Sequence, residues 1–97
     1  MGAETGSGSI RTRVIYSGTV QGVSFRATAR HLAARRPVVG FVRNLADGRV
    51  ELEAEGTRPE VDGLLGDIER EFAGYIEDRE QQSLPVRGAE SRFDIRY

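Results

Sequence analysis

Two glycines four residues apart, Gly18 and Gly22, separate a β-like segment from one with helical periodicity. The segment 10–17 before them is rich in β-branched residues, and the segment 24–35 after them repeats apolar residues at helical spacing. A strand, a glycine-rich turn and a helix N-terminus form an anion socket, because free backbone N–H groups and the helix dipole converge there. Arg26, in the first turn of the predicted helix, adds a planar group that can bind a phosphate with two hydrogen bonds.

The next segment predicts a second strand and a hairpin. Pro37 ends the helix, since the residue before a proline is pushed out of the α region, and 38–45 then has strand character. Asp47-Gly48 is a hairpin turn signal, and the strand after it alternates apolar residues with glutamates. We expect this strand to have one face in water and to form no metal site; the water-facing residues are Glu51, Glu53 and Glu55.

The second half of the chain predicts a helix followed by two strands. Thr57-Arg58-Pro59-Glu60 is a capping box with proline in the first turn. A weakly marked strand lies within 75–84, and a last strand alternates over 93–97. The order βαββαβ plus a short terminal strand predicts an α+β fold of ferredoxin-like type. This is a two-layer sandwich, with an antiparallel sheet and both helices on one face.

The topology brings a second polar side chain to the socket. A right-handed crossover through the first helix makes the first two strands parallel, so their C-terminal ends lie at the same edge of the sheet. The loop 18–26 and Asn44 should therefore meet at that edge. Asn44 also has the parity of Val42, which we expect to face the core, so its amide should project toward the helix layer.

The ends of the chain differ in composition from the rest. Residues 1–9 are rich in glycine and serine and lack periodicity, which predicts a flexible tail before one domain over 10–97. No apolar run approaches membrane-spanning length and no secretory leader occurs, so we expect a cytoplasmic protein.

Composition excludes several kinds of site. The chain has no cysteine, which excludes disulfides, thiolate nucleophiles and cysteine metal sites. All fourteen basic residues are arginine, so lysine-based chemistry is excluded as well. His31 falls away from the apolar stripe of the first helix, and we expect it to be a surface residue and not a metal ligand.

Charge is distributed unevenly along the chain. Residues 1–50 contain eight arginines and two acidic residues, whereas 51–97 contain six arginines and thirteen acidic residues. The basic first half suits a small anionic ligand, and the acidic second half argues against broad nucleic-acid binding.

Two motifs and the helix between them resemble the acylphosphatase family. The first motif is Gly18-x-Val20-Gln21-Gly22-Val23-x-Phe25-Arg26. The second is Gly40-Phe41-Val42-Arg43-Asn44-Leu45-x-Asp47-Gly48-x-Val50. With the terminal Phe93-x-Ile95-Arg96-Tyr97, the resemblance extends over nearly the whole predicted domain.

The resemblance implies a hydrolase that cleaves acyl phosphates, the carboxyl-phosphate mixed anhydrides, to carboxylate and inorganic phosphate without metal or cofactor. Carried over by motif position, Arg26 binds the phosphoryl oxygens and Asn44 orients the attacking water. The backbone N–H groups of the loop complete the phosphate site, which comprises Val20, Gln21, Gly22, Val23, Ser24, Phe25 and Arg26. We expect a monomer that acts on a small-molecule acyl phosphate and binds neither nucleic acid nor membrane.

Two alternatives belong to other classes. A non-catalytic ferredoxin-like module could bind RNA or another ligand, but RNA binding needs stacking aromatics, and the first strand offers only Tyr16. Similar domains also occur at the front of larger carbamoyl-transfer proteins. The sequence ends at Tyr97, which we take to favour the single-domain hydrolase.

Overall fold

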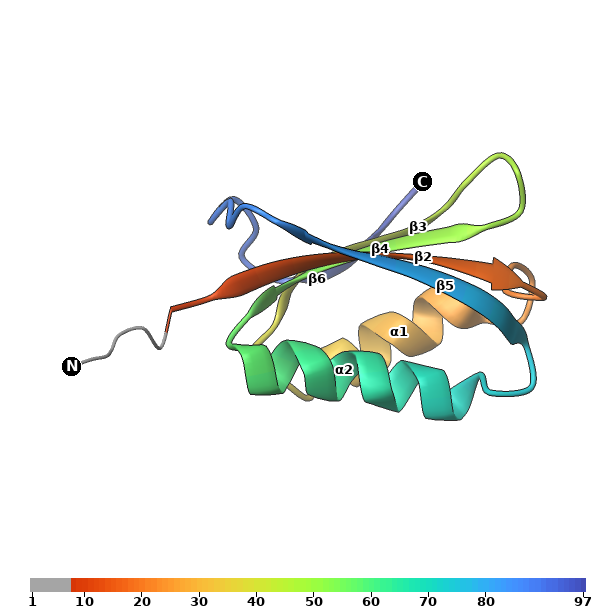
Figure 1. The fold of residues 1–97 in the computed structure, drawn as a ribbon, viewed down its shortest axis with the longest axis horizontal. Helices are drawn as coiled ribbons and strands as arrows, with labels where there is room; N and C mark the ends of the chain where they lie inside the picture. The colour runs from red at the N-terminus through yellow and green to blue at the C-terminus, as the bar shows by residue number, and fades with distance from the viewer. Residues whose placement is uncertain (1–7) are drawn as a thin grey trace.

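The computed structural model describes residues 8–97, and its elements follow the predicted order (Figure 1). In chain order they are β2 (Ile10–Gly18), α1 (Phe25–Ala33), β3 (Val39–Asn44), β4 (Val50–Gly56), α2 (Arg58–Glu71), β5 (Ile76–Leu84) and β6 (Phe93–Arg96). The weakly marked strand within 75–84 is therefore confirmed as β5. The tail predicted over 1–9 lies, as far as residue 7, outside the described residues.

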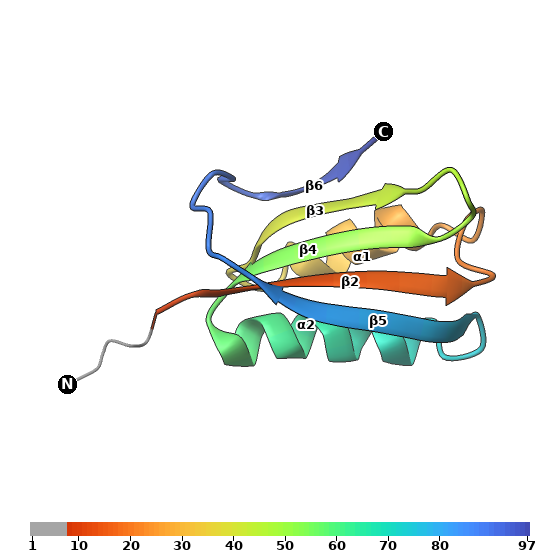
Figure 2. The same ribbon diagram turned by 45° about the horizontal axis from the view of Figure 1, so that its top comes forward.

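The five strands form one sheet in the order β5-β2-β4-β3-β6 (Figure 2). Strand β4 pairs antiparallel with both β2 and β3, so β2 and β3 run in the same direction, as predicted. The prediction of an antiparallel sheet is wrong for the last strand, because β6 pairs parallel with β3. Strand β5 ends beside Arg11, at the start of β2, and the chain then crosses that end of the sheet. Strand β6 thus begins beside Gly40, at the start of β3.

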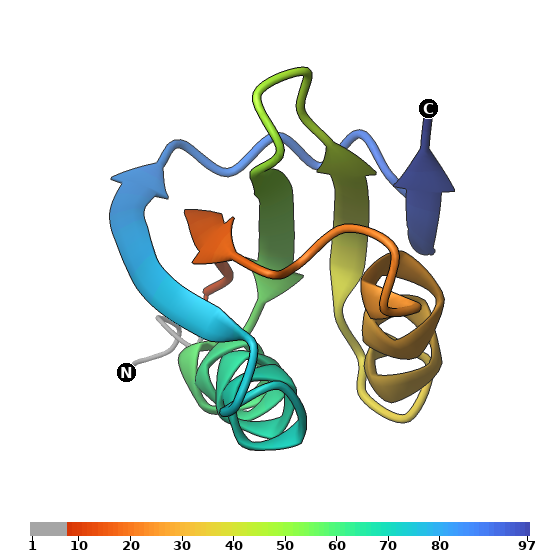
Figure 3. The same cartoon turned by 90° about the vertical axis from the view of Figure 1, so that its right-hand side faces the viewer.

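Both helices pack on one face of the sheet (Figure 3). Val50, Leu52 and Ala54 alternate along β4 and are fully buried, so they face the helices as their spacing predicts. The two layers enclose one apolar core, formed by Val14, Tyr16, Val20, Phe25, Ala29, Ala33, Val38, Val42, Val50, Leu52, Ala54, Val61, Leu64, Leu65, Ile68, Phe72 and Phe93. The α+β ferredoxin-like sandwich is confirmed. No helix among residues 8–97 combines the length and apolar character that crossing a bilayer requires.

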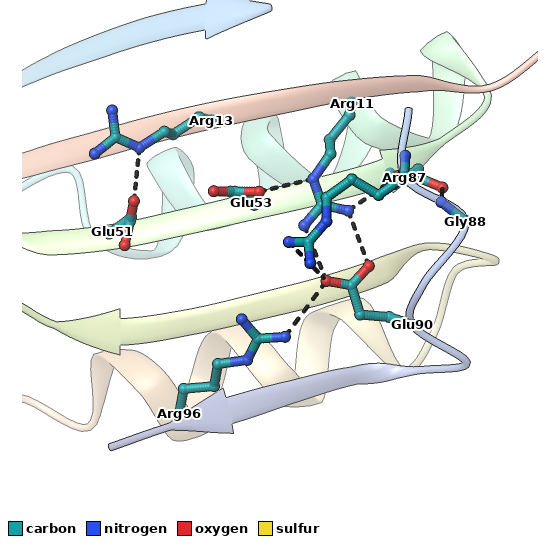
Figure 4. A network of polar contacts seen from close by, with 9 residues as sticks. Arg11, Arg13, Glu51, Glu53, Arg87, Gly88, Glu90 and Arg96 are labelled. Atoms are coloured by element: carbon teal, nitrogen blue, oxygen red, sulfur yellow. Dashed lines mark hydrogen bonds and ion pairs between the residues drawn. The ribbon is translucent and has the colours of Figure 1, made fainter. Parts of the chain in front are cut away.

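The opposite face of the sheet carries a covered network of ion pairs (Figure 4). The Arg11 side chain is 0% exposed, and it donates hydrogen bonds to Glu53 at 2.7 Å, Glu55 at 3.0 Å and Glu90 at 2.9 Å. The backbone N–H groups of Arg87 and Gly88 also donate to Glu55. The segment after β5 is therefore held down over the outer face of β2 and β4.

The expectation that the glutamates of β4 face water is wrong for two of them. Glu51 and Glu55 are 3% and 6% exposed. The alternation places them on the outer face, but β4 is a central strand, and arginines on both neighbouring strands cover it. Glu51 accepts hydrogen bonds from Arg13 of β2 at 2.6 Å and from Arg43 of β3 at 2.5 Å. Burial alone would raise the pKa of Glu51, but these two guanidinium groups hold it below its ordinary value.

Candidate active site

The loop between β2 and α1 begins at a position that only glycine fits. Gly18 has φ of +120°, and a Cβ atom there would lie 2.4 Å from the carbonyl oxygen of Tyr75. The next backbone N–H, that of Thr19, donates a hydrogen bond to the same oxygen at 2.9 Å. The end of β2 is therefore fixed against the turn that precedes β5, and the loop leaves the sheet from a defined point.

Two further left-handed residues turn the loop into α1. Gly22 has φ of +80° and Ser24 has φ of +62°. Ser24 is the N-cap residue of α1, but its hydroxyl makes no capping hydrogen bond. A capping hydroxyl needs an extended backbone at the N-cap residue, and the left-handed conformation of Ser24 aims its side chain elsewhere. The N–H groups at the start of α1 thus keep their donor capacity.

The loop and the first turn of α1 present a run of unused backbone donors. In residues 8–97, no backbone hydrogen bond of a loop, turn or cap is donated by residues 20–26. Several N–H groups in a tight loop ahead of a helix form a concave surface of positive potential. The helix dipole adds to this potential at the same end.

Arg26 and Asn44 line one cavity in front of this loop. The cavity has a volume of about 210 Å³ and takes in five of the seven residues predicted to hold phosphate. Its walls are Val20, Gly22, Ser24, Phe25, Arg26, Ala27, Asn44, Ile95 and Tyr97. Gln21 and Val23 are not among the lining residues. The structure thus brings together the guanidinium and the amide that lie 18 positions apart in the chain.

The end of β3 places Asn44 on the helix side of the sheet. Asn44 is the last residue of β3 and pairs with Val50, the first residue of β4. Val42, two residues earlier on the same strand face, is fully buried in the core. The side chain of Asn44 therefore projects toward the layer that contains α1, as the alternation predicts.

Three residues of the cavity, Ala27, Ile95 and Tyr97, were not predicted as site residues, and Ala27 directly follows Arg26 on α1. Ile95 and Tyr97 reach it from the chain end that includes β6, and the Tyr97 ring centre lies 4.9 Å from the guanidinium carbon of Arg26. The alternation over 93–97 predicts a strand but not which strand it pairs with. Only the parallel pairing with β3 brings this segment beside Asn44.

A larger hollow of about 660 Å³ lies at the far end of α1, next to α2. It contains arginines, but Arg36 is paired with Glu60 at 3.1 Å and with Asp67 at 3.0 Å. An anion there would have to displace carboxylates, whereas the loop cavity offers donors without such competitors. The smaller cavity is therefore the better anion site.

The structure also shows the side chains that were considered as metal ligands. His31 is exposed on α1, as expected. Among residues 8–97, no three His, Cys, Asp or Glu side chains lie close enough together to hold a metal ion.

A ferredoxin-like sandwich whose first βα loop offers backbone donors and an arginine defines a class of small anion-binding domains. The sequence model of the acylphosphatase family matches residues 12–95, which is most of the chain. This protein belongs to the acylphosphatase family.

Individual relatives agree with this assignment. An acylphosphatase of Rubrobacter xylanophilus is 41% identical over 96 residues, which cover 98% of this chain and 87% of the relative. An acylphosphatase of Anaeromyxobacter is 58% identical over 55 residues, which cover 57% of this chain. That match spans 59% of the relative, and a match to an acylphosphatase of Chloroflexus aurantiacus spans 61%, so each covers less than two thirds of the relative's length.

Solved structures of the family have the same fold. The crystal structure of an acylphosphatase from Bacillus subtilis matches with a TM-score of 0.81 and 29% identity, covering 91% of this chain and 99% of that one. An acylphosphatase from Coxiella burnetii also gives a TM-score of 0.81, with 28% identity over 98% of this chain and 100% of that one.

Proposed function

We propose that this protein hydrolyses acyl phosphates to a carboxylate and inorganic phosphate. The observation that carries the proposal is that Arg26 and Asn44 line one cavity together with residues of a loop whose backbone N–H groups donate no loop, turn or cap hydrogen bond. Membership of the acylphosphatase family supports the same reaction.

The loop and Arg26 bind the phosphoryl group in this proposal. Phosphoryl transfer needs positioning of the reactants and stabilisation of charge on the equatorial oxygens. Backbone N–H groups held by the fold supply that stabilisation without reorganisation. Arg26 adds two parallel N–H donors, and the ring of Tyr97 limits the directions in which its guanidinium can turn.

Asn44 orients the attacking water. The water oxygen forms a bond to phosphorus while the bond from phosphorus to the acyl oxygen breaks, and the carboxylate leaves with the electron pair. The proton of the water passes to a non-bridging oxygen of the phosphoryl group. An amide that accepts one hydrogen bond from the water and holds it in line with the leaving group contributes through orientation.

The chemistry of the substrate explains why this site needs no strong protein acid or base. A carboxylate is a good leaving group, so no side chain has to protonate it. The phosphoryl oxygen serves as the base. The positive potential comes from Arg26 and from the phosphate cradle, which is the set of backbone N–H groups of residues 20–26. We therefore propose a mechanism without metal or cofactor, acting in the cytoplasm on a small-molecule acyl phosphate.

We further propose that the protein works as a monomer and binds no nucleic acid or membrane. An RNA-binding role is less well supported, because Phe41 on the outer face of β3 is only 4% exposed. The guanidinium of Arg96 lies 4.0 Å from the centre of its ring, so this ring offers no open stacking surface.

The proposal is tested with a panel of acetyl, carbamoyl and benzoyl phosphate, each assayed with and without a chelator. We expect hydrolysis that survives the chelator. Arg26→Ala should lower the rate about 10²–10³-fold, the usual effect of removing one transition-state donor. Arg30→Ala is the matched control, since Arg30 lies one turn later on α1 and does not line the cavity. Equal activity of the two variants would contradict the assigned site, and loss of activity in chelator would contradict the metal-free mechanism.

A further inference from the structure

The side chain of Gln21 does not face the cavity; it reaches across to the turn that joins β3 and β4. Its Nε2 atom donates hydrogen bonds to the carbonyl oxygen of Leu45 at 2.8 Å and to that of Arg49 at 2.9 Å. These two carbonyls close the hairpin, because the backbone N–H of Leu45 also donates to Arg49. Leu45 directly follows Asn44, so the amide of Gln21 binds next to the residue proposed to hold the water.

The chemistry of the acceptors determines the orientation of the Gln21 amide. Both partners are carbonyl oxygens, which only accept hydrogen bonds, so the NH₂ group must face them. The opposite orientation would place the Oε1 atom against two other oxygens. Gln21 therefore uses both N–H bonds of its amide on one hairpin.

These contacts join two parts of the site that the sheet does not connect directly. The loop follows β2 and Asn44 ends β3, and β4 lies between these two strands (Figure 3). Among residues 8–97, the two bonds of Gln21 are the only hydrogen bonds between the loop 19–24 and the β3–β4 turn. Beyond the pairing of the strands, the hydrogen bonds of one side chain thus tie the loop to the turn that follows Asn44.

We propose that Gln21 is a positioning residue that fixes the place of the Asn44 amide relative to the phosphate cradle. This inference rests on the proposed function, since it assigns Gln21 an effect on turnover through Asn44. Phosphate binding depends on the loop and Arg26 and does not require the β3–β4 turn. Loss of the Gln21 bonds therefore impairs the chemical step and leaves phosphate affinity nearly intact.

The direct test is Gln21→Met, which keeps the length of the side chain and removes both donors. Leu45 and Arg49 keep their backbone partners, so the fold should tolerate the change. We expect kcat to fall about tenfold or more, because small displacements of a reacting group are costly. KM and competitive inhibition by inorganic phosphate should change less than about twofold. Gln81→Met is the control, since Gln81 is an exposed glutamine on β5.

A double-mutant cycle separates positioning from a general structural effect. In the Asn44→Ala background, adding Gln21→Met should lower kcat less than about twofold, because the group it positions is gone. The inference would be overturned if the reductions of kcat in the two single variants multiplied in the double variant. It would also be overturned if Gln21→Met lost phosphate inhibition as much as turnover.

The signals of the Asn44 side-chain NH₂ in a ¹H–¹⁵N spectrum give a readout that does not depend on activity. They can be assigned by their loss in Asn44→Ala. We expect them to shift in Gln21→Met and to stay in place in Gln81→Met. If the wild-type protein hydrolysed no acyl phosphate, the proposed function would fail, and these signals would still decide the positioning role. Unchanged signals in Gln21→Met would overturn it.

Discussion

The most informative perturbation of the fold is Arg11→Met, which removes the centre of the outer ion-pair network and keeps a long side chain. The Arg11 side chain is 0% exposed, and its three glutamate partners are 7–12% exposed at their side chains. Removing one partner of a buried ion pair costs about 3–5 kcal/mol, because the remaining charge stays buried without compensation. Glu55 keeps the N–H groups of Arg87 and Gly88, so we expect the lower end of this range, about 3 kcal/mol.

This loss should be visible in urea unfolding followed by circular dichroism. In thermal unfolding of a domain of this size, a loss of about 3 kcal/mol corresponds to a Tm lower by about 12–24 °C. Arg92→Met is the matched control: Arg92 pairs with Asp94 at 3.0 Å, but its side chain is 80% exposed. An exposed pair contributes less than about 1 kcal/mol. If both variants lost the same free energy of unfolding, the covered network would not stabilise the protein as argued.

Two further predictions concern the loop and acid stability. Gly18→Ala should lower the free energy of unfolding by about 2–3 kcal/mol in a urea titration, because φ is positive and the new Cβ atom would meet the carbonyl oxygen of Tyr75. Gly74→Ala should have no such effect, since a Cβ atom there would have no other atom within 4 Å. Equal effects of the two would contradict the assigned strain. The pKa of Glu90 lies below its ordinary value of 4.5, chiefly because of the Arg11 hydrogen bond. A carboxyl with a lowered folded-state pKa adds stability above its ordinary pKa and loses it as the pH falls through the folded-state value. Below about pH 4.5, the urea concentration at the unfolding midpoint should therefore fall as the pH is lowered, and it should fall less steeply with pH in Arg11→Met than in the wild type. Equal pH slopes in the two proteins would contradict the Arg11 hydrogen bond as the cause.

The order of strands and helices could be predicted from the spacing of the apolar residues and from the positions of glycines and proline. Apolar residues at spacings of 2 and 3.6 predict the strands and helices, and the glycines and Pro37 predict the breaks between them, although α1 already ends at Ala33. The partnership of Arg26 and Asn44 followed from two rules, that a crossover makes β2 and β3 parallel and that side chains alternate along a strand.

The remaining features depend on contacts that local patterns do not encode. Alternation puts Glu51 and Glu55 on the outer face, but their burial arises because side chains from β2 and β3 and the segment after β5 cover that face. The parallel pairing of β6 depends on how the connection after β5 crosses the sheet. The sequence predicts only a backbone N–H contribution from Gln21, since nothing in its neighbours predicts that its side chain binds carbonyls 24 and 28 residues away.

The central claim is that Arg26 and Asn44 act on one phosphoryl group in different ways. The most direct measurement is the turnover of benzoyl phosphate, together with competitive inhibition by inorganic phosphate, in Arg26→Ala and Asn44→Ala. We predict that kcat/KM falls about 10²–10³-fold in both variants, that Arg26→Ala loses phosphate inhibition, and that Asn44→Ala keeps most of it. An Asn44→Ala protein that hydrolyses benzoyl phosphate as fast as the wild type would contradict the account.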